Sequence, residues 1–332
     1  MAIERMSENI IEIAKPMESA IIQGSLARCP FLFKDPFKPL QFVHFSDVHS
    51  MLDPWDRIMT FINHYEDYLS FGIHTGDYCA GTIEEYTDLY EYGVPTDLPV
   101  FTCTGNHDRA AKDHHTVTKE EVYTHLFNRS KKWNVNFMDC AFPMAYYKDF
   151  PESNVRLIAL DLYFDVEEQI TWLNNLLAEA KESGMHVITA MHQPTSTIVN
   201  HPETTFHTAF QWGSVGGPVV STPFEDPIAS FVESGGNYVC NLCGHHHHDL
   251  FGYTERGVLN VAVEMATCWA PWDDSNRVFD TRSYDCFNVT SVDVNTGVLR
   301  LIRIGNNVDY YLRRKTTFCY DYVNKKVVYN GR

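Results

Sequence analysis

The stretch Leu40-Gln41-Phe42-Val43-His44-Phe45-Ser46-Asp47-Val48-His49 decides the fold. It begins as a short apolar run and ends in Asp47 and His49, as a buried strand does when it reaches a polar loop. Runs of the same kind follow along the chain, and longer segments of helical periodicity lie between them. This rhythm is that of βαβ units, and it predicts an α/β fold.

Segments that share this pattern are predicted to be strands. They are 40–46, 71–74, 100–103, 155–160, 186–191, 237–243, 258–264, 284–292 and 298–304. Two amphipathic helices are predicted between them, the first after Pro54 and the second after Asp165. Asp165 and Glu168 have the spacing of a capping box, and Gly184 is well placed to end the second helix.

Residues 1–39 are predicted to form a helical extension that packs on the main body. Ile10, Ile13 and Met17 recur at roughly helical spacing, whereas acidic residues interrupt any apolar stretch long enough for a signal peptide or a membrane span. Residues 40–332 contain no repeat and no obvious linker, so one domain is predicted there.

Charge and cysteine content restrict the binding partners and the cellular compartment that we expect for the protein. The chain has 26 Lys and Arg against 43 Asp and Glu, a formal charge of −17. Such a surface repels a nucleic-acid backbone, so nucleic acid is not an expected partner and a small anion needs a local positive site. The 9 cysteines do not form a dense disulfide framework; they indicate a reduced compartment, and the cytoplasm is the predicted location. No membrane partner is predicted, and the oligomeric state is left open.

Five predicted strand ends carry side chains that bind metals. They present Asp47 and His49, then Asp77, then Asn106 and His107, then His192, then the run His245 to His248. Ligand sites in open α/β sheets form at the carboxyl ends of strands, so we expect these groups to converge. Oxygen and nitrogen donors without a thiolate suit Mn, Fe or Zn. The donors are too many for one ion with an open position and about right for two.

The five blocks resemble the calcineurin-like metallophosphoesterase family, whose pattern is D-x-H, G-D, G-N-H-D/E, H and G-H-x-H. The chain has Asp47-Val48-His49, Gly76-Asp77, Gly105-Asn106-His107-Asp108, His192 and Gly244-His245-His246-His247. The similarity runs from about Leu40 to His247, with Gln169-x-x-Trp172-Leu173 as a weaker echo. It implies a four-layer α/β/β/α sandwich of two mixed sheets, with residues 40–332 as the catalytic domain.

The resemblance implies a binuclear enzyme that hydrolyses a phosphate ester with a metal-bridging hydroxide. One ion would be held by Asp47, His49, Asp77 and His247, and the other by Asp77, Asn106, His192 and His245. Asp77 would then bridge two cations about 3.5–4 Å apart. Two divalent ions against two aspartates leave the centre with a charge of about +2, which attracts phosphate despite the acidic surface.

His107 and Asp108 are the predicted catalytic residues. By resemblance, His107 points to the substrate rather than to a metal, and it binds the substrate together with Asn106. His107 could donate a proton to the leaving oxygen, and Asp108 could hold its ring in the needed orientation.

Three interpretations stay open. The ligands in the histidine run could be His246 and His248, although the preceding Gly244 favours His245 and His247. The Cys240-x-x-Cys243 spacing suits zinc or redox chemistry, but without a second cysteine pair a buried strand is favoured. Residues 201–227 and 269–274, which contain aromatic side chains, either cover the site or pack as core.

The substrate class is narrowed by an arginine that is missing. Ser/Thr protein phosphatases of the family carry G-D-x-V-D-R-G, whereas this chain has Gly76-Asp77-Tyr78-Cys79-Ala80-Gly81. The expected substrate is therefore a small-molecule phosphodiester or phosphomonoester, including a nucleotide. The alternatives are a catalytically silent metal-binding scaffold and a nuclease of the same superfamily. No ligand position is damaged, which disfavours the scaffold, and the acidic charge disfavours the nuclease.

Overall fold

The apolar runs form buried strands in the computed structural model, which describes residues 9–25, 36–79, 89–109, 117–200, 221–247, 249–267, 277–278, 283–305 and 317–330. Every residue of β1 (Leu40–Phe45) and β2 (Phe71–His74) is buried. Strands that are covered on both faces read as continuous apolar runs, which is why these segments do not alternate. The predicted strands are confirmed, with ends that shift by about two residues or less.

The described strands form two mixed sheets. In the first sheet the order is β15-β14-β13-β12-β1-β2-β3, and in the second it is β4-β5-β6-β7-β9-β11-β10-β8. The first sheet adds β3 (Val100–Thr102), β12 (Cys286–Asp293), β13 (Val298–Gly305), β14 (Thr317–Asp321) and β15 (Lys326–Asn330) to β1 and β2. The second contains β4 (Asn136–Phe137), β5 (Tyr146–Phe150), β6 (Val155–Ala159), β7 (His186–Ala190), β8 (Ile198–Asn200), β9 (Tyr238–Cys243), β10 (Leu250–Thr254) and β11 (Leu259–Ala262).

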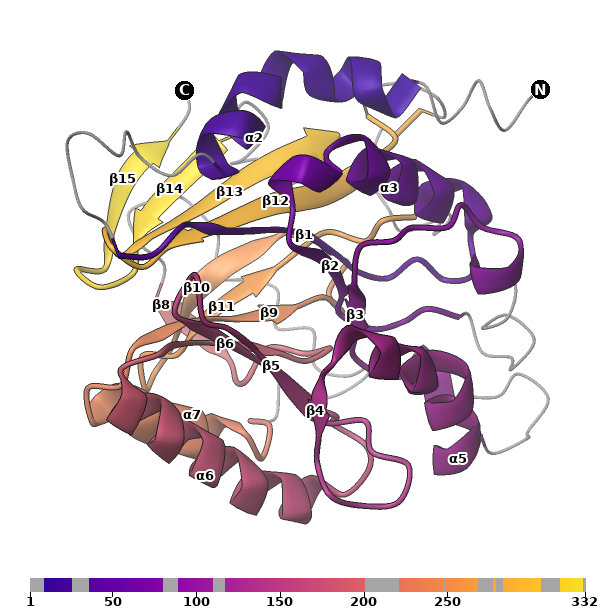
Figure 1. The fold of residues 1–332 in the computed structure, drawn as a ribbon. Coiled ribbons are helices and arrows are strands. Elements are labelled where there is room, and N and C mark those ends of the chain that lie inside the picture. Colours follow the sequence, from indigo (N-terminus) through magenta and orange to yellow (C-terminus); the bar gives the residue numbers. More distant parts are fainter. Residues whose placement is uncertain are drawn as a thin grey trace.

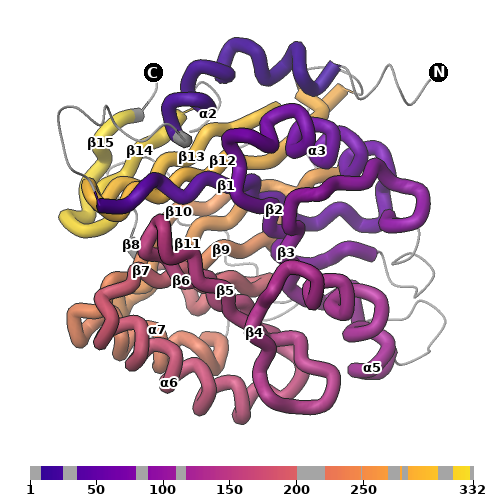
Figure 2. The backbone as a smooth tube through the Cα atoms, in the orientation of Figure 1, coloured from indigo at the N-terminus to yellow at the C-terminus, as the bar shows by residue number. Residues whose placement is uncertain are grey.

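Helices cover the outer faces of both sheets (Figures 1 and 2). On the side of the first sheet lie α2 (Glu18–Ser25) and α3 (Leu52–His64), and on the side of the second lie α6 (Val166–Ser183) and α7 (Glu225–Glu233). Shorter helical turns are η1 (Lys15–Met17), η2 (Glu66–Tyr68), η3 (His107–Arg109), α5 (Lys119–Val122), η4 (Tyr123–Phe127) and η5 (Asn128–Trp133). The predicted four-layer sandwich is confirmed.

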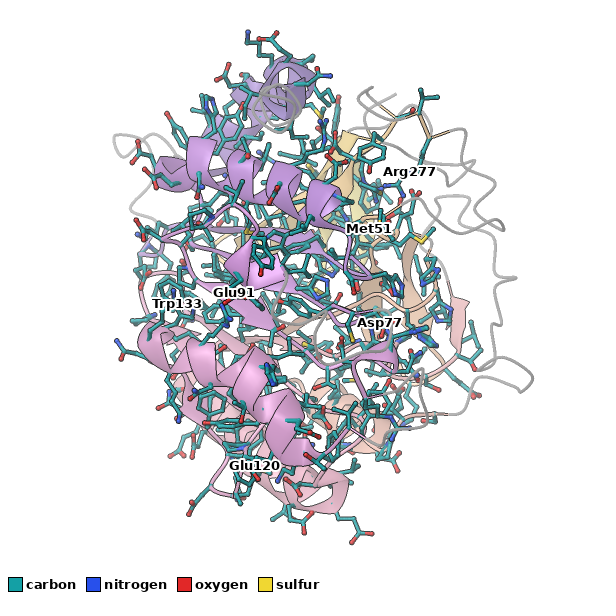
Figure 3. All side chains as sticks on the ribbon, turned by 90° about the vertical axis from the view of Figure 1, so that its right-hand side faces the viewer. Met51, Asp77, Glu91, Glu120, Trp133 and Arg277 are labelled. Carbon is teal, nitrogen blue, oxygen red and sulfur yellow. The ribbon has the colours of Figure 1, made fainter. Side chains whose placement is uncertain are left out.

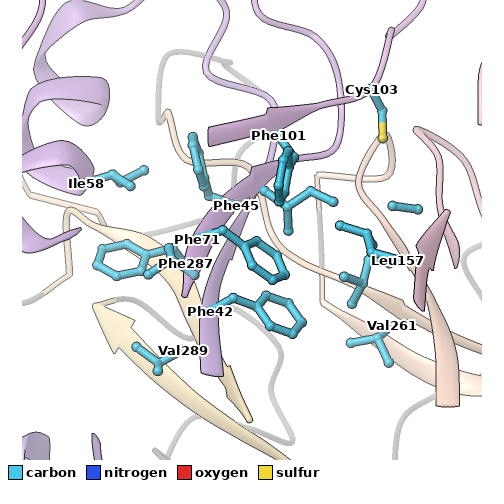
Figure 4. Packing of buried hydrophobic residues seen from close by; sticks show 14 of the residues in the cluster. Phe42, Phe45, Ile58, Phe71, Phe101, Cys103, Leu157, Val261, Phe287 and Val289 are labelled. Atoms are coloured by element: carbon cyan, nitrogen blue, oxygen red, sulfur yellow. The ribbon is translucent and has the colours of Figure 1, made fainter. Parts of the chain in front are cut away.

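Aromatic and aliphatic side chains fill the space between the two sheets. Phe42, Phe71 and Phe101 come from the first sheet and face Leu157 and Val261 of the second (Figure 4). The rings of Phe42 and Phe71 stack with centroids 4.6 Å apart. Burial of these rings removes a large apolar area from water, which is the main source of stability in such a core.

The N-terminal helical segment packs against the first sheet. Ile10 and Ile21 are fully buried, and α2 contacts β1, β12 and β13. The side chain of Gln41 donates to the carbonyl oxygens of Ile21 and Tyr68 at 2.9 and 3.1 Å, which ties the segment to the start of β1. An amphipathic helix can thus bury its apolar face on the sheet.

The apolar pattern does not predict six strands at or next to sheet edges, although it does predict the edge strand β3. They are β4, β5, β8, β10, β14 and β15. These strands are short or mix polar with apolar residues: the centre of β5 is half-exposed, whereas β10 and β14 are mostly buried.

One local prediction is wrong. Asp165 precedes α6 at a φ of 49° and makes no capping hydrogen bond, because its carboxylate pairs with Lys119 instead. The helix does end at Gly184, in the predicted left-handed conformation at a φ of 71°. At the end of the segment 201–227, α7 begins at Glu225, and 201–220 lie outside the described residues.

Candidate metal centre

The loops that carry the predicted ligands meet at one edge of the sandwich. Strands β1, β2 and β3 are parallel neighbours in the first sheet, and β7 and β9 are parallel neighbours in the second. Their carboxyl ends therefore point to the same edge, and each is followed by one predicted block. Figure 3 views this side of the molecule, where Asp77 is labelled at the end of its strand.

The backbone turns sharply at these strand ends. Five predicted ligands have positive φ angles: Asp47 (56°), His49 (49°), Asp77 (58°), His245 (66°) and His247 (58°). The left-handed region is unfavourable for residues with a β-carbon, although Asp and His enter it more readily than most. Backbone strain of this kind is typical of functional sites, where the surrounding structure fixes it.

The glycines of the blocks permit close approach between loops. A β-carbon at Gly105 would lie 2.1 Å from Oδ1 of Asp77, and one at Gly244 would lie 1.9 Å from Oγ of Ser46. Both contacts are far shorter than van der Waals separation. Glycine is therefore required at these positions for packing, beyond any conformational preference.

A first group of donors consists of Asp47, His49, Asp77 and His247, which we call the Asp47 group. One potential ligand atom from each of these residues lies within 4.8 Å of the others. Nε2 of His247 is 3.3 Å from Oδ1 of Asp47 and 3.3 Å from Nε2 of His49. Nε2 of His49 is 4.0 Å from Oδ2 of Asp77.

A second group, the Asn106 group, consists of Asp77, Asn106, His192 and His245. Nε2 of His192 lies 3.3 Å from Oδ2 of Asp77 and 3.1 Å from Oδ1 of Asn106. Nδ1 of His245 lies 2.9 Å from the same oxygen of Asn106 and 3.2 Å from Nε2 of His192. Oδ2 of Asp77 thus borders both groups.

Hydrogen bonds behind the groups orient the donors. Nδ1 of His192 lies 2.8 Å from the carbonyl oxygen of Thr75 and donates to it, which directs Nε2 toward Asp77 and Asn106. The backbone N–H of His245 donates to Oδ2 of Asp47 at 3.1 Å. That bond connects the two groups and keeps the other Asp47 oxygen turned toward His247.

Burial sets the protonation of the histidines. It lowers the pKa of His49 to about 4 and that of His245 to about 3, so both imidazoles are neutral near pH 7. Burial also acts on His192, but the Asp77 carboxylate outweighs it and raises the pKa of His192 to about 9. Although burial opposes ionisation, nearby histidines hold the pKa of Asp47 well below its usual range, and His192 lowers that of Asp77.

The donor set fits divalent metal ions. Ring nitrogens of His49 and His247, and of His192 and His245, lie only 3.2–3.3 Å apart. Two carboxylates, an amide oxygen and four imidazoles are ligands that Mn, Fe and Zn accept, and neutral imidazole is the form that binds. Two neighbouring ions that share Asp77 would match the arrangement of the two groups.

His107 lies beside the donors but belongs to neither group. Its ring meets the ring of His49 edge-on, with centroids 4.9 Å apart, and its backbone N–H donates to Oδ1 of Asp77 at 2.8 Å. The backbone bond fixes where the side chain starts, and the ring is half-buried at the border of the Asp47 group. Its position agrees with a group that contacts substrate instead of metal.

The contacts of Asp108 differ from the prediction. One oxygen accepts from the backbone N–H groups of Tyr78 and Cys79 at 2.8 and 3.1 Å, and the other accepts from Asp77 and Gly105 at 2.9 and 2.7 Å. These four donors occupy the lone pairs of the carboxylate, so the predicted bond to the His107 ring is not made. Asp108 instead joins the loop after β2 to the loop after β3.

The loop after β6 also reaches this edge, and the block pattern gives no sign of it. Asp161 accepts from the backbone N–H groups of Tyr163 and Phe164 at 2.8 and 2.6 Å. The Gln169 side chain accepts from the backbone of Asp161 and donates to the carbonyl oxygens of Asp161 and Phe164. The available signal was Asp161 itself, an acidic residue directly after a predicted strand.

The alternatives left open by the sequence are partly settled. Cys240 and Cys243 are fully buried in β9, as the buried-strand interpretation predicts. The cysteines of the described segments are all free thiols. Nδ1 of His245 belongs to the Asn106 group and Nε2 of His247 to the Asp47 group, whereas His246 is in neither group. His248 and the segment 269–274 lie outside the described residues.

Comparison with known proteins decides the family. A sequence profile described as calcineurin-like phosphoesterase matches residues 40–249. The chain belongs to this family. Membership places this metallophosphoesterase among the phosphoric ester hydrolases, and the match covers all five blocks. No curated protein matches the sequence significantly.

A solved phosphatase structure shares the fold, and a second is a more distant match. A dimetal phosphatase from Danio rerio has a TM-score of 0.52 and 13% identity, and the match covers 80% of this chain and 96% of that one. Purple acid phosphatase PPD1 from yellow lupin (Lupinus luteus) seeds has a TM-score of 0.49 and 14% identity, with 90% of this chain and 54% of that chain covered. Among the described residues of the present chain, no helix is both long and apolar enough to cross a membrane.

Proposed function

We propose that this metallophosphoesterase hydrolyses a small-molecule phosphate ester with two metal ions, Mn, Fe or Zn, held by the Asp47 group and the Asn106 group. The observation that carries the proposal is the position of Asp77, whose Oδ2 lies 3.3 Å from Nε2 of His192 and 4.0 Å from Nε2 of His49. One carboxylate oxygen that borders both groups suits a bridging ligand.

Bound ions would supply an activated water and would stabilise the charge that develops on the phosphoryl oxygens. The protein contributes the geometry. Asp47, His49 and His247 hold one side of the centre, and Asn106, His192 and His245 hold the other. Because the loops are fixed by Asp108 and by strained turns at the strand ends, little reorganisation is needed during the reaction.

His107 is proposed to act on the leaving group. It follows Asn106 directly and lies beside His49, so its ring can face an ester oxygen on the open side of the centre. As a general acid it would donate a proton to the leaving alkoxide. Asn106 is proposed to bind the substrate as well, and Asp108 to position the backbone of both loops.

Residues 40–332 are proposed as the catalytic domain, with residues 1–39 as an extension packed on it. The burial of Ile10 and Ile21 against the first sheet supports this division. The formal charge of −17 supports a small substrate over nucleic acid. The cytoplasmic location stays a prediction.

The test is an assay of metal content and turnover on the purified chain. After metal removal and reloading with Mn²⁺, we expect two bound ions per chain and hydrolysis of p-nitrophenyl phosphate, bis-p-nitrophenyl phosphate or both. Two bound ions without turnover of either ester would favour the silent scaffold. His107→Ala should keep both ions and lose about 10²-fold or more in kcat. The exposed His64→Ala is the matched control, and loss of metal in the His107 variant would contradict its proposed role.

A further inference from the structure

We propose that Arg109 and Tyr163 form an anion-recognition pair beside the metal centre and direct this enzyme toward phosphate monoesters. The inference rests on the proposed function and adds the substrate class to it. Arg109 ends η3, two residues after His107, and Tyr163 lies in the loop after β6. Two segments that are far apart in the sequence thus meet at the edge of the centre.

The pair is held by direct contact. The guanidinium carbon of Arg109 lies 4.4 Å from the centroid of the Tyr163 ring. Stacking on an aromatic face orients a guanidinium but leaves its N–H groups free to bind oxygen. Arg109 is exposed and has no ion pair with any described residue, so its charge is available to a ligand.

The hydroxyl of Tyr163 is buried and has no hydrogen-bond partner in the part of the chain that the structure describes. A buried hydroxyl that has lost water without gaining a partner is unfavourable, so a ligand oxygen that accepts from it is favoured. Burial and then the nearby Asp77 charge raise the pKa of Tyr163 well above its usual range. The phenol therefore stays protonated and can donate a hydrogen bond. The effect of the Asp77 carboxylate on this pKa also shows that Tyr163 lies near the metal centre.

The loop that presents Tyr163 is rigid. Asp161 accepts two backbone N–H groups of the turn, and Gln169 bridges both of its ends with three hydrogen bonds. A loop held in this way presents the phenol in one position before substrate arrives, which lowers the entropic cost of binding.

The chemistry of the pair favours one class of ester. A monoester carries a phosphoryl group with two negative charges at neutral pH, and a diester carries only one. A guanidinium with a planar fork of donors, next to a phenol, matches the additional anionic oxygen of the monoester. A diester places its second organic group where this oxygen would be, and the pair would gain less from it.

The experiment compares kcat/KM for p-nitrophenyl phosphate and bis-p-nitrophenyl phosphate in the Mn²⁺-loaded enzyme. We expect the wild type to prefer the monoester. Arg109→Gln should lower kcat/KM for the monoester about tenfold or more, with a smaller effect on the diester, because a charge-assisted hydrogen bond is lost. Tyr163→Phe should act in the same direction by raising KM. Arg109→Lys should restore part of the loss.

Matched controls are Arg256→Gln, which removes a surface guanidinium paired with Asp226 and Glu233, and Tyr329→Phe on exposed β15. A second readout is competitive inhibition by inorganic phosphate, which should weaken in the Arg109 and Tyr163 variants while metal content stays unchanged. If the wild type turns over neither ester, the proposed function fails. If it turns over esters but prefers diesters, or if Arg109→Gln lowers both rates equally, the recognition pair is wrong and the proposed function stands.

Discussion

The Asp47 group and the Asn106 group are built from similar donors but differ in charge. The first contains two carboxylates with two imidazoles, whereas the second shares Asp77 and adds only a neutral amide to its imidazoles. The first comes largely from the loop after β1 and the second from loops after β3, β7 and β9. A cation in the second group would keep more of its positive charge, so that side is better suited to attract the phosphoryl group.

The largest expected effect on catalysis comes from replacing Asp77, the residue that the two groups share. Asp77→Asn removes the proposed bridging carboxylate, and kcat/KM should fall by about 10⁴-fold because each ion contributes several kcal/mol. Metal content should drop from two ions toward one or none, as measured by elemental analysis after gel filtration. Retention of two tightly bound ions by this variant would rule out Asp77 as the bridge.

Removing a carboxylate from the Asp47 group, or adding one to the Asn106 group, should have an intermediate effect on catalysis. Asp47→Asn should release one ion and lower kcat/KM by about 10³-fold, because the Asp47 group loses half of its carboxylates. Asn106→Asp should retain two ions and lower kcat only about tenfold, since added negative charge weakens phosphate attraction. Metal titration and steady-state kinetics on both variants test the comparison. Equal effects would show that the groups are not functionally different.

A smaller effect is expected where the groups are joined through the backbone. Asp108→Asn replaces an acceptor oxygen by an amide that donates, so two of its four backbone bonds are lost. Metal affinity should weaken by about 10–100-fold, as for other residues that support metal ligands. Isothermal titration with Mn²⁺ measures it. An effect on kcat alone, with unchanged affinity, would restore the original idea that Asp108 acts through His107.

The smallest effect on catalysis is expected from His44, a buried residue of β1 near the Asp47 group that affects the stability of the fold at acidic pH. Burial, with the Arg303 charge, lowers the pKa of His44 to about 3, so the folded protein keeps this residue neutral while the unfolded chain binds a proton below its ordinary value of 6.5. Stability is therefore lost as pH falls from 6.5 toward 3, by about 2 kcal/mol for this residue near pH 5.

Chemical denaturation at neutral and acidic pH tests this expectation. His44→Gln should reduce the acid-induced loss by about that amount, and it should leave activity at neutral pH nearly unchanged. His64→Gln on the surface of α3 is the control. In β7, the residue at the equivalent distance before His192 is Thr189, which does not titrate. Before the shared Asp77, however, stands His74, whose pKa burial also lowers to about 3, so this residue adds acid sensitivity behind both groups.

Much of the centre could be predicted because its information is local. An apolar run followed by Asp or His marks a strand end, and parallel strands bring such ends to one edge, as for Asp47, Asp77 and His192. The role of Asp108 could not be predicted in this way. Three of its four partners are backbone N–H groups of a loop about thirty positions earlier in the chain, and they become neighbours only when β2 and β3 pair.

The missed elements have a related cause. The centre of β5 is partly exposed, and the buried strand β14 is a short stretch of mixed sequence, Thr-Phe-Cys-Tyr-Asp, so neither shows a continuous apolar run. Tyr163 was missed because its loop carries no block of the family pattern, and its contact with Arg109 depends on the packing of one sheet against the other. Hydrophobic periodicity predicts each helix or strand separately, whereas these features depend on contacts between different strands and loops.

The shared carboxylate also has a thermodynamic consequence. If Asp77 serves both ions, the free energy of binding one ion depends on whether the other is present, and the dependence is equal in both directions. The first cation would draw Asp77 away from His192, whose proton is then easier to lose. Loading of the enzyme would thus be a linked process that releases protons, and the available metal and the ambient pH together would set the fraction of active molecules.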